Sequence, residues 1–233
     1  MARPALLPDL LRQRARVRPD AVALAVDGGG SLTLRQWHER STNAGRGLTT
    51  SGVAAGDRVA LVFDNRRWLD LAVAYLAVLR AGAVAVPLTR RFPAWDLRRA
   101  LSDCDPALVI GPDDLAVGRG PWARAALADL EAETAPVPED GPPDPDAPAE
   151  WLYPGEAMRH PVPERFTHAD IAVPTDAFSG IGDGTFVHAF PIGTLAGQEA
   201  LRLPLRQEDS VAVAVAAFAP DDFVARAARR GAI

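Results

Sequence analysis

The sequence contains no lysine, because all 25 of the basic residues among its 233 residues are arginine. This absence excludes a Schiff base, a lysine general base and a lysine phosphate ligand. Arginine can hold a phosphate group, but it does not exchange its proton near neutral pH. Any permanent positive charge on a side chain therefore comes from arginine.

Cysteine and long apolar runs are also scarce. Cys104 is alone, so no internal disulfide can form, and a reducing compartment fits this usage. The longest apolar runs, Leu71–Leu79 and Val211–Ala219, reach nine residues, whereas a membrane-spanning helix needs about 20. The arginine-rich start has no apolar segment of the kind found in a signal peptide. We therefore expect a cytoplasmic protein with no membrane partner.

The charge and histidine patterns point away from nucleic acid and from metal. A formal net charge of -5 gives no reason to expect a nucleic-acid partner. The four histidines, at positions 38, 160, 168 and 188, do not show the paired spacing of metal ligands. Cys104 lies between two aspartates, which raise the pKa of a thiol, so we interpret it as a small buried residue. The sequence predicts no metal site and no bound cofactor.

Helical and strand patterns alternate along most of the chain. Gly82 is placed to end a long apolar helix in a left-handed conformation, and Pro87 is expected to close the strand that follows. This alternation predicts an α/β fold with mostly parallel sheets flanked by helices. Helices are expected over 6–17, 35–50, 68–81, 93–102, 167–177, 194–205 and 220–230, and strands over 21–26, 32–34, 58–63, 83–86, 107–110, 185–189 and 210–216.

One stretch interrupts the alternation. Residues 134–150 are rich in proline and acidic residues, which do not build a packed core. We interpret the stretch as an exposed connector between a first α/β subdomain, residues 1–133, and a partial second α/β unit, residues 151–233, that completes the sheet. The alternative is an acidic strap that docks a basic partner.

Four segments, taken in order, resemble the adenylate-forming (AMP-binding) superfamily, which includes acyl-CoA synthetases and the adenylation domains of nonribosomal peptide synthetases. They are Ser31–Trp37, Gly52–Leu61, Val78–Leu88 and Cys104–Ile110. The resemblance implies the fold of the N-terminal subdomains of these enzymes. Family members are about twice as long as this chain, and the remainder of their sequence carries the ribose-binding aspartate and a catalytic lysine. The resemblance therefore implies a truncated relative.

The segment Tyr153–His168 resembles the family's phosphate-binding loop in spacing but departs from it in chemistry. Tyr153, Pro161, Thr167 and His168 match the family pattern. The glycine- and hydroxyl-rich stretch of the family is replaced here by Pro154, Gly155, Glu156, Ala157, Met158 and Arg159, and the positions of its lysine and glycine are taken by Val162 and Pro163.

These replacements work against a triphosphate. Cradling a phosphate requires several backbone N–H groups turned inward, which glycine permits and proline does not. Glu156 adds a carboxylate where the phosphates would lie. Two like charges about 4 Å apart repel by about 4 kcal/mol at an effective dielectric constant of 20. We therefore expect no nucleotide cofactor, although Arg159 and His160 offset part of the repulsion.

The segment Phe186–Leu205 resembles the part of the family that lines the acyl-substrate pocket. The residues that this resemblance nominates for substrate binding are Tyr153, His188, Phe190, Gly193 and Thr194. Candidate acid–base residues near the expected pocket are Glu156, His160 and His168.

The sequence thus predicts an adenylation-like pseudoenzyme that serves as a helper, scaffold or partner-binding protein in a biosynthetic pathway. An ATP-independent enzyme that reuses the acyl or aryl pocket, and one half of a split ligase, are the alternatives. The expected partner is a second copy of the chain, or a synthetase or carrier-protein chain, because a truncated fold would expose apolar surface. The contact is expected near residues 211–230.

Overall fold

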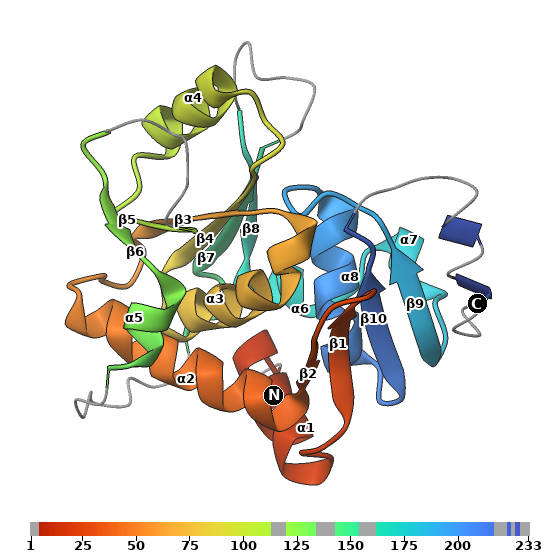
Figure 1. The fold of residues 1–233 in the computed structure, drawn as a ribbon. Helices are drawn as coiled ribbons and strands as arrows, with labels where there is room; N and C mark the ends of the chain where they lie inside the picture. Colours follow the sequence, from red (N-terminus) through yellow and green to blue (C-terminus); the bar gives the residue numbers. More distant parts are fainter. Residues whose placement is uncertain are drawn as a thin grey trace.

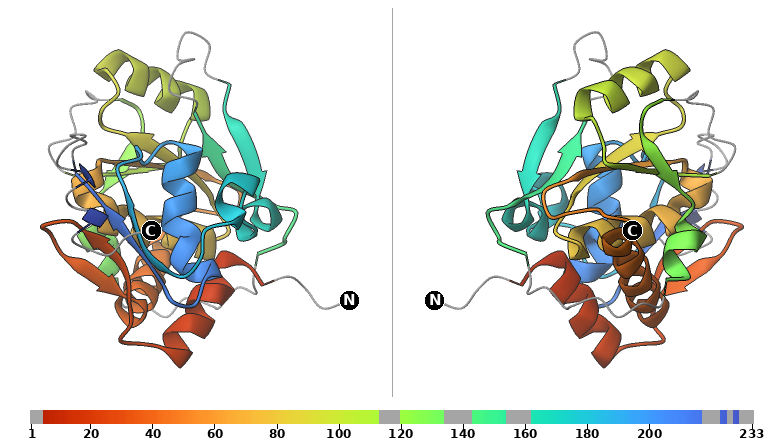
Figure 2. Two further views of the ribbon diagram at one scale, coloured as in Figure 1. Left: turned by 90° about the vertical axis from the view of Figure 1, so that its right-hand side faces the viewer. Right: turned by 90° about the vertical axis from the view of Figure 1, so that its left-hand side faces the viewer.

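The computed structural model of the protein describes residues 5–112, 120–133, 143–153, 162–216, 223–224 and 227–228. Two β-sheets lie side by side, and helix α3 (Trp68–Arg80) lies between them (Figure 1). The side views place helices α1 (Leu7–Val17) and α4 (Ala94–Cys104) at opposite ends of the molecule (Figure 2). The predicted class, an α/β fold with mostly parallel sheets flanked by helices, is confirmed.

The smaller sheet joins strands from the beginning and the end of the chain. Its order is β2-β1-β10-β9. The first two strands form an antiparallel hairpin whose turn contains Gly28, at a φ of 71°, whereas β10 runs parallel to both of its neighbours. The strands are β1 (Val22–Val26), β2 (Ser31–Thr33), β9 (Gly184–His188) and β10 (Ser210–Ala214).

The larger sheet has the order β6-β5-β3-β4-β7-β8, and only β8 runs antiparallel to its neighbour. We expected Pro87 to close the fourth strand, but this strand continues to Thr89. On the side that faces β7, β4 pairs only at Ala85, which lies opposite Glu150. Pro87 lies beyond this pair, so strand β7 does not need the backbone N–H that proline lacks. The strands are β3 (Arg58–Phe63), β4 (Val84–Thr89), β5 (Leu108–Ile110), β6 (Ala123–Ala125), β7 (Pro148–Leu152) and β8 (Glu164–Thr167).

Each sheet takes strands from both sides of the stretch 134–150. Residues 1–133 supply β1 and β2 to the smaller sheet and four strands to the larger one. Residues 151–233 supply β9 and β10 to the smaller sheet and β8 to the larger one. Strand β7 begins at Pro148, inside the stretch 134–150 that we interpreted as a connector.

The remaining helices cover the sheets. Thr33 begins α2 with a capping box, in which its side chain and that of Gln36 each bond the other's backbone N–H. Gly82 follows α3 at a φ of 66°, as predicted for a left-handed helix end. These helices are α2 (Leu34–Thr50), the short 3-10 turn η1 (Asn65–Arg67), α5 (Leu127–Glu131), α6 (His168–Ala172), α7 (Asp176–Ser179) and α8 (Leu195–Arg206).

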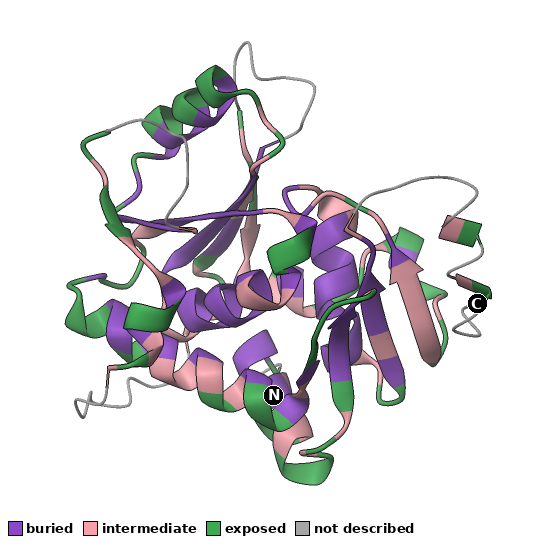
Figure 3. Cartoon of the chain, viewed as in Figure 1, coloured by how far each residue is buried: buried purple, intermediate pink, exposed green. Residues whose placement is uncertain are grey.

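The main hydrophobic core lies around α3, whose residues Leu71–Leu79 are all buried (Figure 3). This core includes residues of both sheets, such as Leu24 of β1 and Leu61 of β3. A second, smaller cluster lies under α4 and contains Leu97 and Tyr153. In the part of the chain that the structure describes, no helix combines the length and the apolar character needed to cross a membrane.

Candidate functional site

The carboxyl ends of strands from both sheets meet near Asn65, which follows β3. Its Nδ2 donates to the backbone oxygen of Phe190, 3.0 Å away, and to that of Val215, 3.4 Å away. Phe190 follows β9 and Val215 follows β10, so one buried amide links the ends of three strands. Ligands of open α/β sheets bind outside the carboxyl ends of the strands. This edge is therefore the candidate site.

The segment after β9 packs closely against β4. A Cβ atom added to Gly193 would lie 3.2 Å from the backbone oxygen of Pro87 and 3.4 Å from the nitrogen of Thr89. One added to Gly197 would lie 2.3 Å from the oxygen of Pro191, a distance that no side chain tolerates. Glycine at position 193 allows the loop between β9 and α8 to approach the end of β4, and glycine at position 197 allows the first turn of α8 to pack against Pro191.

Thr194 fixes the beginning of α8. Its Oγ1 donates to the backbone oxygen of Pro191 over 2.7 Å and accepts from the nitrogen of Gly197 over 3.2 Å. The hydroxyl is thus engaged as a helix cap. Of the residues nominated for substrate binding, Gly193 and Thr194 lie on this loop.

His188 and Phe190 lie in a group of aromatic rings at the end of β9. The ring of His188 is 4.8 Å from that of Trp68 and 5.8 Å from that of Phe190, measured between centroids. Phe178 and Phe186 complete the group. His188 is 2% exposed, and neither ring nitrogen has a hydrogen-bond partner. Burial lowers the pKa of His188 to about 4, so its imidazole is neutral at physiological pH.

Tyr153, the fifth residue nominated for substrate binding, lies in the smaller cluster under α4. It is 1% exposed, and its hydroxyl donates to Oδ2 of Asp103 over 2.6 Å. Burial, followed by this hydrogen bond, raises the pKa of the Tyr153 phenol. The structure therefore groups His188, Phe190, Gly193 and Thr194 and places Tyr153 in a separate cluster.

Of the three acid–base candidates, the structure places only His168. It is buried as the first residue of α6, after the capping residue Thr167. Glu156 and His160 lie outside the described residues, as do Pro154, Gly155, Ala157, Met158 and Arg159.

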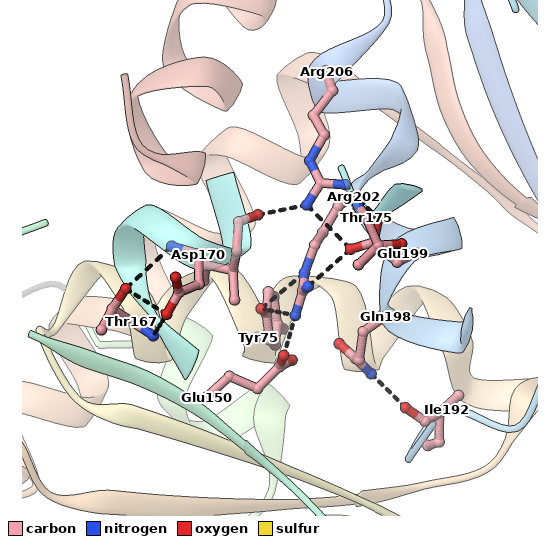
Figure 4. Close-up of polar contacts among 11 residues, drawn as sticks. Tyr75, Glu150, Thr167, Asp170, Thr175, Ile192, Gln198, Glu199, Arg202 and Arg206 are labelled. Atoms are coloured by element: carbon pink, nitrogen blue, oxygen red, sulfur yellow. Dashed lines mark hydrogen bonds and ion pairs between the residues drawn. The ribbon is translucent and has the colours of Figure 1, made fainter. Parts of the chain in front are cut away.

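A buried network of charged side chains connects helix α8 to strand β7 of the larger sheet (Figure 4). Arg202 of α8 is 1% exposed and forms ion pairs with Glu150 of β7 and with Glu199, the latter over 3.2 Å. Its Nη2 also donates to the hydroxyl of Tyr75 on α3 over 2.8 Å. Burial alone would lower the pKa of Arg202, but the charge of Glu150 and its hydrogen bond, together with Tyr75 and Glu199, outweigh this effect and raise the pKa.

The network continues from Glu199 along α8. Its Oε2 accepts from Nη1 of Arg206 over 2.8 Å and from the backbone nitrogen of Thr175 over 3.1 Å. Arg206 also donates to the backbone oxygen of Ile171 over 2.6 Å. Burial would raise the pKa of Glu199, but its hydrogen bonds and the arginine charges lower it. The network thereby fixes α8 against the strand that leads into residues 154–161.

Our sequence analysis did not find this network. Its sequence signals are Glu150 within an otherwise apolar strand and three charged residues spaced along one face of α8. These signals do not identify partners, because Arg202 and Glu150 are 52 residues apart.

Two side-chain donors at the candidate site, those of Asn65 and Thr194, are committed to the protein's own backbone. Asn65 and Thr194 donate to backbone oxygens, and Oγ1 of Thr89 accepts from the nitrogen of Arg91. A nucleotide phosphate needs several donors directed toward it. The side-chain donors of Asn65 and Thr194 are therefore not available to a phosphate, and the segment 154–161, in which the sequence analysis places the phosphate loop, lies outside the described residues.

Mostly parallel sheets with helices packed against them, and a loop and a helix start at the carboxyl ends of the strands, define an α/β protein. Comparison with known families narrows the class. The model of the AMP-binding enzyme family matches residues 11–173, and the chain belongs to this family.

Similar proteins include synthetases and CoA ligases. The chain is 35% identical over 106 residues to a dimodular nonribosomal peptide synthase of Bacillus subtilis, covering 46% of this chain and 4% of that protein. It is 35% identical over 121 residues to an oxalate–CoA ligase of Arabidopsis thaliana, covering 52% of this chain and 23% of the ligase. The chain therefore spans less than a quarter of each of these relatives.

Among solved structures, the fold is similar to the N-terminal subdomain of Klebsiella oxytoca NpsA in complex with 3-hydroxyanthranilyl-AMSN. The TM-score is 0.82 at 22% identity, and the match covers 97% of this chain and 58% of that subdomain. At this identity the likeness shows the fold. The expected resemblance to the N-terminal subdomains of adenylate-forming enzymes is thus confirmed.

Proposed function

We propose that this chain is an adenylation-like pseudoenzyme that serves as a helper, scaffold or partner-binding protein in a biosynthetic pathway. The observation that carries the proposal is the sequence of the phosphate loop, in which Pro154, Glu156 and Pro163 stand where the family has glycines and hydroxyls. Proline removes N–H donors, and the carboxylate repels a triphosphate.

The surroundings of this loop support the proposal. Tyr153 precedes the loop and is fixed by its hydrogen bond to Asp103, while Thr167 follows it and caps α6. The fold that would carry a phosphate loop is therefore retained, whereas the residues that would bind phosphate are replaced. A pseudoenzyme combines a retained fold with lost chemistry.

Isothermal titration of the full chain with magnesium ATP tests the proposal. We expect no measurable heat of binding and no ATP–pyrophosphate exchange with mixed aryl and aliphatic acids. As a control, the same titration with an intact adenylate-forming relative must give binding. Micromolar affinity of this chain for ATP would contradict the proposal.

A second candidate, one part of a split ligase, is favoured by a single observation. The chain covers 58% of the NpsA N-terminal subdomain, so another polypeptide could supply the remaining portion. Against this, separating an enzyme into two chains gives no reason to replace its phosphate loop. Magnesium ATP binding that appears only after a second AMP-binding chain is added would favour the split ligase over the pseudoenzyme.

A further inference from the structure

Arg80, the last residue of α3, is a partly buried arginine that pairs with no carboxylate among the described residues. Its Nε donates to Oγ of Ser41 over 3.3 Å, and its Nη2 donates to Nδ1 of His38 over 2.8 Å, both on α2. Arg202, by contrast, forms ion pairs with two glutamates. Withdrawing a charge from water without a counter-charge costs free energy, so the position of Arg80 favours an anion.

The contact between Arg80 and His38 determines which of their donors remain available. Arginine only donates hydrogen bonds, so Nδ1 of His38 is the acceptor and the ring proton lies on Nε2. Nη1 of Arg80 and Nε2 of His38 have no hydrogen-bond partner among the described residues, and neither atom is closed off from solvent. Two side chains in direct contact therefore offer donors to the same solvent-accessible place.

The pKa values of Arg80 and His38 indicate that positive charge is not fully compensated there. Burial, followed by the charge of Arg12 on α1, lowers the pKa of Arg80 to about 10, and Asp9 opposes this shift. Burial, followed by the charge of Arg80, lowers the pKa of His38; Arg12 acts in the same direction and Glu39 opposes it. Asp9 is already paired with Arg12 over 2.7 Å, and Glu39 is exposed. Three basic side chains thus converge where α1, α2 and α3 pack together (Figure 1).

A cavity beside Arg12 provides room for a ligand. Its volume is about 410 Å³, and its described lining belongs to α1 and consists of Asp9, Arg12, Gln13, Arg16 and Val17. Arg16 is exposed and adds a further positive charge. The three arginines of this region therefore outnumber its two carboxylates, those of Asp9 and Glu39.

We propose that Arg80, His38 and Arg12 form a binding site for a phosphate group. Guanidinium groups match the geometry of phosphate oxygens, and the chain has no lysine that could serve instead. The phosphate oxygens accept from Nη1 of Arg80 and from the Nε2–H of His38, and Arg12 supplies a second guanidinium. The ligand is either free inorganic phosphate or the phosphate of a small organic ester, whose remaining atoms lie in the cavity along α1.

This phosphate site lies apart from the candidate site at the carboxyl ends of the strands. Helix α3 begins after β3 and ends before β4, so Arg80 lies near the amino end of β4. The 13 residues of α3 span about 20 Å, which separates Arg80 from Asn65. The inference therefore does not depend on the proposed function. Arg80→Gln would remove any ATP binding at this site and leave binding at the phosphate loop unchanged, so the two proposals fail separately.

Isothermal titration of the full chain with sodium phosphate, near neutral pH and at constant ionic strength, tests the site. We expect the wild type to bind phosphate and Arg80→Gln to raise the dissociation constant by about tenfold or more, because a charged hydrogen-bond donor is lost. Arg46→Gln is the control, since Arg46 is an exposed arginine of α2 that contacts Asn43. It should leave the dissociation constant unchanged.

A parallel titration with ribose 5-phosphate distinguishes the two sources of the phosphate. Tighter binding of ribose 5-phosphate than of inorganic phosphate would identify an organic ester as the ligand, and equal or weaker binding would identify free phosphate. A wild type that binds neither compound, or equal losses of affinity in Arg80→Gln and Arg46→Gln, would overturn the proposal.

Nuclear magnetic resonance of the wild-type chain gives a readout that does not depend on whether the variant folds. The ring signals of His38 are followed through a pH titration with and without saturating phosphate. Bound phosphate offsets the charges of Arg80 and Arg12, so the pKa of His38 should rise by about 0.5 or more. The pKa of His188, which is buried against Trp68, should not change. An unchanged pKa of His38 in the presence of phosphate would exclude the site.

Discussion

His188 is a buried imidazole that the protein keeps neutral. Its ring nitrogens have no hydrogen-bond partner, and its neighbours are the rings of Trp68, Phe186 and Phe190. Because the folded state holds the pKa of His188 near 4, below the value of about 6.5 for an exposed histidine, the unfolded chain binds a proton at higher pH than the native protein. Protonation therefore favours unfolding as the pH falls from 6.5 toward 4.

We expect His188→Phe to remove this pH dependence. Phenylalanine keeps an aromatic ring in the group and has no ionisable nitrogen. Between pH 7 and pH 4 the wild type should lose about 2–3 kcal/mol more unfolding free energy than the variant. Urea unfolding followed by circular dichroism at several pH values measures the difference. Equal losses in the two proteins would show that His188 takes up its proton without cost.

Single residues were predictable where the sequence alone determines their role. Gly82 was predicted as a left-handed helix end, and this is confirmed. Cys104 is buried, as expected, and burial raises the pKa of its thiol to about 12. The hydrogen bond from Tyr153 to Asp103 was not predictable, because it joins residues 50 positions apart.

Arg202 connects helix α8 to strand β7 of the larger sheet. The guanidinium lies in the junction between the sheets and contacts Glu150, Glu199 and Tyr75. Removing one member of a buried ion pair leaves an unpaired charge in a nonpolar environment. We expect Arg202→Met to lower the free energy of unfolding by about 3–5 kcal/mol.

A double-mutant cycle separates the charge effect from packing. Glu150→Gln combined with Arg202→Met should cost less than the sum of the two single changes, because the double variant leaves no unpaired charge at that position. Arg35→Met is the control, since its ion pair with Asp20 is exposed and such pairs contribute at most about 1 kcal/mol. Strictly additive costs would mean that Glu150 and Arg202 do not depend on each other.

Helices α2 and α5 touch at Gly47. A Cβ atom added there would lie 2.3 Å from the backbone oxygen of Leu130, so the helices would have to separate. We expect Gly47→Ala to cost about 2 kcal/mol or more. Gly45→Ala, two residues away, is the matched control, because its Cβ would meet Ala77 at an ordinary 3.4 Å.

That control should be neutral or should stabilise the protein by up to about 1 kcal/mol, since alanine favours the helix. Thermal unfolding of both variants measures the difference. Similar melting temperatures for the two alanine variants would show that α5 can shift without cost.

The long elements were predictable from their periodicity, and several short ones were not. Strand β3 spans Arg58–Phe63, as predicted, and helix α3 ends one residue before its predicted end. Strand β6 and helix α5 have three and five residues, too few to show a period. The predicted end of β4 at Pro87 was wrong, because a proline is tolerated within a strand where no neighbouring strand needs a backbone N–H.

At the scale of the whole molecule, the parallel α/β class followed from the alternation of elements, but the assignment of strands to sheets did not. Strand β1 pairs with β10, which lies almost 190 residues further along the chain. Long-range pairing of this kind depends on which apolar faces meet, and the sequence pattern does not specify those faces. The family resemblance pointed to the loop after β9, where substrate binding by Gly193 and Thr194 stays a prediction, but it did not point to Asn65, whose partners become visible only when three strand ends meet.

The shared core predicts that the two sheets unfold together. Buried residues of both sheets, among them Leu24 and Leu61, belong to one hydrophobic cluster around α3, and Arg202 adds a charged connection across the same junction. Neither sheet therefore has a main core of its own that would keep it folded alone. We expect urea unfolding of the full chain to give one transition, with circular dichroism and tryptophan fluorescence coinciding. Arg202→Met should lower the urea concentration at the midpoint of both signals by the same amount. Two separate transitions would show that the sheets are independent folding units.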